Sequence, residues 1–204
     1  MEQVITLYHM NDRDCISSFT KKNELIKSTH KQDDLWCGEG MYFWDSLGNA
    51  NYWRFRLRKV KYFLDKNTDL KEEAKKFKQK LDKLRQDDKR SDPYLQRYLE
   101  FYKISSTTIK CSLNNILDLT DRDEFRIFKM YIEKLNLPPG DLYIGKAVDK
   151  FCEINDYSVV KIHGRYDIIS DYKIPKNKIS FKVKTIYCIK KDSKIICENK
   201  IAPD

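Results

Sequence analysis

Segments with the pattern of β-strands lie near both ends of this chain, with helical patterns between them. Segments 3–10 ("QVITLYHM") and 105–112 ("STTIKCSL") are rich in β-branched and aromatic residues, which is typical of strands. Segments 157–164 and 185–195 have the same character, whereas 121–137 and 145–155 have apolar residues at helical spacing. This order predicts an α+β fold in which strands from both ends of the chain meet around one cleft.

Residues 62–103 differ in composition from the rest of the chain. Apolar residues recur there at helical spacing among lysines and acids, at Leu70, Ala74, Phe77, Leu81 and Leu84. Pro93 suits the first turn of a second helix. We therefore predict one domain, 1–204, interrupted by a helical hairpin over 62–103. The charged face of this hairpin is either simply solvated or a contact surface for a polyanion.

The charge balance bears on the kind of partner. The formal net charge of the 204 residues is +9, which favours a polyanionic partner such as nucleic acid; the alternative is that the lysine-rich composition reflects genome bias. The six cysteines include no C-x-x-C pair and no spacing of a zinc site, so no metal is expected. Neither a secretion signal nor an apolar run of membrane-spanning length is present, and we expect a cytoplasmic protein without membrane contact.

The segment 37–53, "CGEGMYFWDSLGNANYW", concentrates aromatic residues and glycines in a chain with six glycines and three tryptophans. Glycine allows close approach of a backbone or a ligand, and aromatic faces suit flat, partly charged rings. One interpretation is a buried strand followed by a turn. The other is a pocket for a planar ligand. Downstream, Ser46 is a candidate N-cap of a helix that carries Arg54 and Arg58 along one side.

Residues 7–53 resemble the front half of an ADP-ribosyltransferase of the diphtheria-toxin and poly(ADP-ribose) polymerase type. That family opens with a strand ending in a histidine, here "LYHM" with His9. A glycine–aromatic strand follows, here "GEGMYFWD", and then a step ending in "ANY", here "SLGNANYW". The late segment "IYCIKKDSKI" is similar to a strand near the end of the family's domain. The resemblance implies split antiparallel β-sheets around an NAD cleft.

The resemblance also implies roles for particular residues. His9 would hydrogen-bond a ribose hydroxyl, Tyr42 would line the cleft, and Tyr52 would stack on the nicotinamide ring. The glycines would let the strand approach the dinucleotide. The implied catalytic positions are His9, Tyr42 and Ile186, and the implied NAD-binding positions are His9, Met10, Asn11, Gly40, Tyr42, Tyr52 and Arg54.

Two departures from the family pattern bear on activity. Met10 stands where the family has glycine, at a position that works through its backbone. Ile186 stands at the third catalytic position, which is a glutamate in polymerising members, so chain extension is not expected. An isoleucine cannot serve as a base. Glu39 and Glu198 are candidates for that role, with an ordinary surface carboxylate as the alternative for each.

The function that this resemblance implies is mono-ADP-ribosyl transfer from NAD to a protein or nucleic-acid acceptor, in an intracellular bacterial toxin or phage-defence effector. Such an enzyme would harm its host, so an antitoxin or inhibitor protein is a candidate partner. An inactive module that binds NAD, ADP-ribose, nucleic acid or a partner is the alternative. An RNA 2′-phosphotransferase shares the fold, but the paired histidines of that family are not found here.

Overall fold

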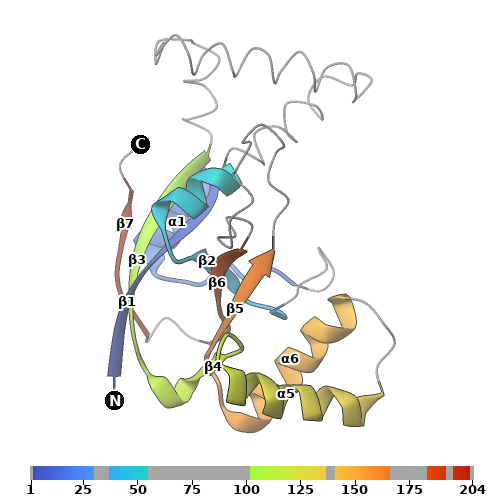
Figure 1. Ribbon diagram of the computed structural model, residues 1–204. Helices are drawn as coiled ribbons and strands as arrows, with labels where there is room; N and C mark the ends of the chain where they lie inside the picture. The colour runs from blue at the N-terminus through green and yellow to red at the C-terminus, as the bar shows by residue number, and fades with distance from the viewer. Residues whose placement is uncertain are drawn as a thin grey trace, which may run out of the picture.

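In a computed structural model the chain has the α+β class that the sequence predicts. Its strands form one mixed seven-stranded sheet instead of the split antiparallel sheets that the resemblance implies. The structure describes residues 2–29, 37–54, 102–136, 141–165, 183–191 and 195–202. The strands are β1 (Glu2–Asp12), β2 (Met41–Trp44), β3 (Tyr102–Ser112), β4 (Ile116–Asp118), β5 (Val159–Arg165), β6 (Val183–Ile189) and β7 (Ile196–Ile201). Their order across the sheet is β4-β5-β6-β2-β1-β3-β7, and segments from both ends of the chain are therefore neighbours (Figure 1).

The sheet is antiparallel except between β4 and β5, which run parallel. Its longest ladder joins β1 to β3 over the full length of both strands, from Glu2 opposite Ser112 to Asp12 opposite Tyr102. By contrast, β1 and β2 share a single register pair, Tyr8 with Trp44. This seam divides the sheet into a β4-β5-β6-β2 part and a β1-β3-β7 part, and the strands separate immediately beyond it.

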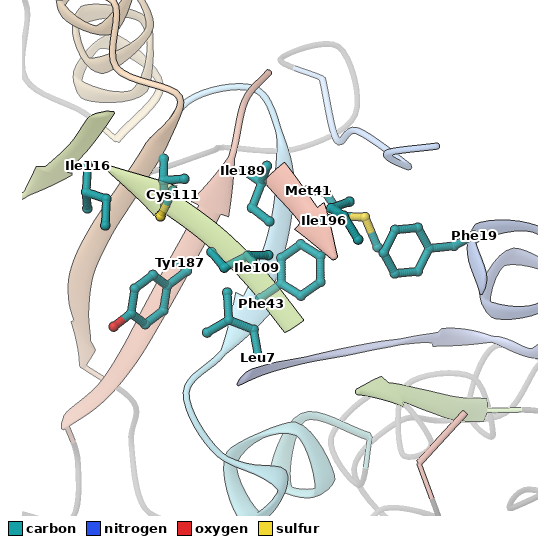
Figure 2. Packing of buried hydrophobic residues seen from close by; sticks show 11 residues of the cluster. Leu7, Phe19, Met41, Phe43, Ile109, Cys111, Ile116, Tyr187, Ile189 and Ile196 are labelled. Atoms are coloured by element: carbon teal, nitrogen blue, oxygen red, sulfur yellow. The ribbon is translucent and has the colours of Figure 1, made fainter. Parts of the chain in front are cut away.

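One face of the sheet is covered by α1 (Arg13–Lys22). Asp12 caps this helix by accepting a hydrogen bond from the Cys15 backbone N–H at 2.8 Å, and Asn23 ends it in the left-handed conformation. Phe19 of the helix is fully buried against alternate strand residues, including Leu7 and Phe43 (Figure 2). Alternation along the strands directs their other side chains to the opposite face.

The opposite face of the β4-β5-β6 part is covered by α5 (Arg122–Leu135) and α6 (Asp141–Asn155), which Figure 1 shows beside these strands. Asp121 caps α5, where its carboxylate accepts hydrogen bonds from the N–H groups of the first helical turn. Phe128, Val148 and Phe151 from the two helices pack onto the sheet in one apolar cluster, which also contains the buried thiols of Cys37, Cys152 and Cys188.

Several boundaries differ from those predicted. The strand expected over 105–112 begins at Tyr102, so the last two residues of the proposed insertion 62–103 belong to β3. The rest of that insertion lies outside the described residues. The helix expected over 145–155 begins at Asp141, and β4 and β7 were not expected as strands. Within the described part of the chain, no helix has the length and apolar character needed to cross a membrane.

Candidate functional site

His9 lies at the seam between β1 and β2, one residue beyond the pair that joins them. Its ring Nδ1 is 2.6 Å from the backbone oxygen of Tyr42, so the imidazole bridges the two strands where their backbones separate. Its Nε2 lies 3.5 Å from the side-chain nitrogen of Asn11. The ring is buried between Phe19 and Phe43, with centroids 6.3 and 5.4 Å away.

This environment defines the protonation state of His9. A backbone oxygen only accepts hydrogen bonds, so Nδ1 must carry the proton that it donates to Tyr42. Burial lowers the pKa of His9 to about 4 from 6.5, although the bond to Tyr42 acts in the opposite direction. At neutral pH the imidazole is therefore uncharged, and its Nε2 is an acceptor, which the Asn11 side-chain N–H approaches at 3.5 Å. A group of this kind accepts a hydrogen bond from a hydroxyl.

The Tyr42 side chain is held on the opposite face of the sheet from His9. Its hydroxyl donates to the Gly38 backbone oxygen at 2.8 Å and accepts from the Cys37 N–H at 3.2 Å. Burial, reinforced by the neighbouring Cys188 and Cys37 thiols, raises the pKa of Tyr42 well above its usual value. The phenol stays protonated at physiological pH, and in this arrangement it fixes the 37–40 loop.

A buried ion pair holds the same loop from α6 and the end of β6. The Lys190 ammonium lies 2.5 Å from the Asp149 carboxylate, 2.5 Å from the Cys37 backbone oxygen and 3.1 Å from that of Glu39. The Asp149 carboxylate also accepts the Glu39 backbone N–H, at 3.0 and 2.9 Å. The Lys190 side chain is only 8 % exposed, and its three donors have three acceptors.

Two glycines of this loop allow the close packing. A Cβ built on Gly38, whose φ is 73°, would lie 2.1 Å from an Asp149 carboxylate oxygen. A Cβ on Gly40 would lie 2.5 Å from the Cys188 sulfur and 2.7 Å from the Ile189 backbone oxygen. The close approach is thus to atoms of the protein itself. That packing explains both glycines without a ligand, including Gly40, which the family resemblance assigns to NAD binding.

Substitution of Gly40 by alanine is expected to lower the free energy of unfolding by about 1–3 kcal/mol, because the new methyl group meets backbone of β6 that cannot move freely. Chemical denaturation measures the change. Gly48→Ala is the matched control, since no atom lies within 4 Å of its Cβ position and it stands in helical segment 47–54. There alanine is neutral or stabilising. Equal stability of both variants would contradict this packing.

Candidate residues from three strands and a helical segment gather on the Tyr42 face of the sheet. Met10, Trp44 and Ile186 are buried there in one cluster, with Tyr42 and Tyr52 packed against it. Ile186 is 2 % exposed and pairs with Trp44 on β2 and Ile162 on β5. The structure thus brings together Met10, Tyr42, Tyr52 and Ile186 on one face. The His9 ring lies on the other face, against Phe19 and Phe43, and is not part of this cluster.

The helix predicted to follow Ser46 begins at residue 47. The Ser46 hydroxyl accepts the Asn49 N–H at 3.2 Å, which confirms it as the N-cap. Arg54 is buried in this segment, 3 % exposed, whereas Arg58 lies outside the described residues. The Lys184 ammonium lies 4.7 Å from the centre of the Tyr52 ring, so one ring face is already in contact with a cation.

The two glutamates considered as substitutes for a catalytic acid, Glu39 and Glu198, lie outside the cluster that contains Ile186. Glu198 is on β7 at the sheet edge, paired with Thr108, and three strands, β2, β1 and β3, lie between it and β6. That position excludes it as a replacement for a carboxylate at Ile186. Glu39 is in the 37–40 loop, where its backbone is held by Asp149 and Lys190.

Sequence reasoning did not identify Asp149 or Lys190, which organise the loop beside Tyr42. Asp149 is one of three acids on α6, and Lys190 follows a strand in a lysine-rich chain, so neither carries a local signal. Comparisons with family models, curated proteins and solved structures returned no match.

Proposed function

We propose that this chain is a mono-ADP-ribosyltransferase that uses NAD and modifies a protein or nucleic-acid acceptor. The observation that carries the proposal is the neutral His9 in the seam, whose Nε2 is an acceptor approached by the Asn11 side-chain N–H at 3.5 Å. This is the state required to accept a hydrogen bond from a ribose hydroxyl. The family resemblance of "LYHM" and "GEGMYFWD" supports the assignment. The parting of β1 from β2 at His9 gives this single sheet a partial likeness to the split sheets of that family.

In the proposed reaction the bond between the nicotinamide nitrogen and the ribose anomeric carbon breaks, and its electron pair leaves with nicotinamide. The acceptor then attacks the oxocarbenium-like carbon. By the resemblance His9 would orient the ribose and Tyr52 would stack on nicotinamide, so the dinucleotide would have to reach both faces of the sheet at the seam where β1 and β2 separate. Positioning of this kind accounts for a large part of the rate of such reactions.

The side chain at position 186 favours an acceptor that needs no deprotonation. Ile186 supplies no base, and Met10, Trp44 and Ile162 beside it are apolar as well. A carboxylate or phosphate oxygen attacks without losing a proton, so the reaction balances with an anionic acceptor. Lys184, two residues before Ile186 and on the same face of the strand, adds a positive charge that would attract such a group.

A second candidate function is binding without turnover. It is favoured by the burial of Trp44 and Met10, which are 7 % and 4 % exposed and occupy the centre of the cluster where the nicotinamide would sit. In that case the chain binds ADP-ribose or a macromolecular partner. The two candidates differ in whether nicotinamide is released.

The test uses NAD labelled on its adenylate phosphate, incubated with the full chain and cell extract. We expect release of nicotinamide and transfer of label to macromolecules. Loss of the label on nuclease treatment would identify a nucleic-acid acceptor, and loss on protease treatment a protein acceptor. His9→Ala should lower both signals at least about 100-fold. His163→Ala is the matched control, because this exposed histidine on β5 lies outside the cluster.

Circular dichroism and denaturation establish that each variant is folded. A folded wild type that releases no nicotinamide and labels nothing would overturn the transferase. Calorimetry with ADP-ribose would then test the binding function. Equal activity in His9→Ala and wild type would instead remove His9 from the site.

A further inference from the structure

A pocket of about 460 Å³ lies beside α6, next to the loop that Tyr42 holds. It is within the size range of sites for small molecules. Lysines from three parts of the chain line it, namely Lys27 before the loop, Lys146 and Lys150 on α6, and Lys191 after β6. None of these residues belongs to the candidate NAD site described above.

The charges at the inner end of the pocket are satisfied within the protein. Lys190 and Asp149 both line it, but the Lys190 ammonium directs its donors to Asp149 and two backbone oxygens. The Asp149 carboxylate is occupied by Lys190 and the Glu39 backbone. This ion pair therefore shapes the pocket, and the charges left to determine what binds are the other lysines and the carboxylates of Glu39 and Glu153, which also line it.

The outer lysines differ in how far they are neutralised. Lys150 lies 2.8 Å from Glu153, and Lys191 lies 2.5 Å from Asp156, so each has an acidic partner. For Lys27 and Lys146, which are both exposed, the described residues provide no ion pair. The pocket thus carries two lysine ammonium groups that are available to an anion.

Tyr157 also lines the pocket. The Tyr157 ring is stacked on Phe151, with centroids 6.2 Å apart, and this contact fixes its position. Among the described residues no partner accepts the Tyr157 hydroxyl proton, and burial raises the pKa of this group, so it remains a donor at neutral pH. Two cations and one hydroxyl in a concave site match an oxyanion with several acceptor atoms.

We propose that this pocket binds a small phosphate-bearing anion, with Lys27 and Lys146 as its charged contacts and the Tyr157 hydroxyl as a further donor. The inference does not depend on NAD chemistry. A phosphate group carries up to two negative charges and offers several acceptor oxygens, so it can engage all three side chains at once. Bound there, it would lie against the loop that positions Tyr42.

Calorimetric titration of the full chain with inorganic pyrophosphate, at low ionic strength, tests this site. We expect one saturable site per chain. The double variant Lys27→Ala/Lys146→Ala should weaken the affinity by at least about tenfold, because each lysine supplies a charge-assisted contact. Tyr157→Phe should weaken it less. Both lysines are exposed and unpaired in the described structure, so the variant should fold.

The matched control is Lys129→Ala, an exposed lysine on α5 that lies outside the pocket. It should bind pyrophosphate as the wild type does. Absence of saturable binding in the millimolar range would overturn the proposal. So would wild-type affinity in the double variant, since the anion would then bind elsewhere, for example at the candidate NAD site. An equal loss in Lys129→Ala would indicate attraction by overall charge alone.

Discussion

Replacing Asp149 by alanine is expected to lower the free energy of unfolding by about 3–5 kcal/mol. The change leaves the Lys190 ammonium, 8 % exposed, without its counter-ion. It also removes the acceptor of the Glu39 backbone N–H. Both losses fall on the 37–40 loop, so the variant should also lose the fixed position of the Tyr42 hydroxyl. Urea denaturation of the purified chain measures the effect.

Two further variants separate the buried charge from the general loss of contacts. Asp149→Ala combined with Lys190→Met should be more stable than Asp149→Ala alone, because no uncompensated charge remains. Lys191→Ala breaks the neighbouring but exposed pair with Asp156, and it should change stability by less than about 1 kcal/mol. If Asp149→Ala were as mild as Lys191→Ala, the pair would not hold the loop.

Acidification from pH 6.5 to pH 4 is expected to cost the protein about 3 kcal/mol of stability through His9 alone. The native pKa is lowered to about 4 from 6.5, so over this interval the unfolded chain binds a proton that the folded chain does not. The contribution is therefore fully present above pH 6.5 and is lost as the pH falls toward 4. Denaturation curves at a series of pH values give the slope.

Carboxylates also titrate in this range, so the contribution of His9 is obtained by comparing the pH dependence of stability of the wild type with that of a variant that lacks the imidazole. His9→Gln lacks the titrating ring, and its stability should fall less steeply between pH 6.5 and pH 4 than that of the wild type. The difference between the two slopes should integrate to about 3 kcal/mol. Parallel curves would show that His9 titrates normally, and hence that its ring is open to water in the folded protein.

The fold class could be predicted because its elements carry strong local patterns. The β-branched and aromatic run at 3–10 and the amphipathic run at 121–137 each define an element without help from the rest of the chain. In β7, "ICENKI", apolar and polar residues do not alternate regularly. This segment depends on pairing with β3 for its strand conformation. Tertiary pairing of this kind leaves little trace in a single segment.

The candidate site was predictable only in part, for a related reason. The strand patterns place His9 and Tyr42 on two separate strands, but neither they nor the resemblance indicates that the two side chains lie on opposite faces of the sheet. No local pattern shows that His9 bonds to a backbone oxygen across a seam, because this depends on where two strands separate. The glycines are similar. Their spacing suggests that another group approaches the backbone closely. Only the structure shows that these groups are the side chains of Asp149, at Gly38, and of Cys188, at Gly40.

The ladder between β1 and β3 has a consequence for the order of events during synthesis. Its partners are 90 to 110 residues apart in the sequence, from Asp12 with Tyr102 to Glu2 with Ser112. At about 5–20 residues per second, a ribosome takes roughly 5–20 s to supply the second strand after the first. During that interval β1 has no long partner, and its exposed edge is a site for wrong pairing. Early packing of Phe19 of α1 against Leu7 of β1 would reduce this exposure until β3 has emerged.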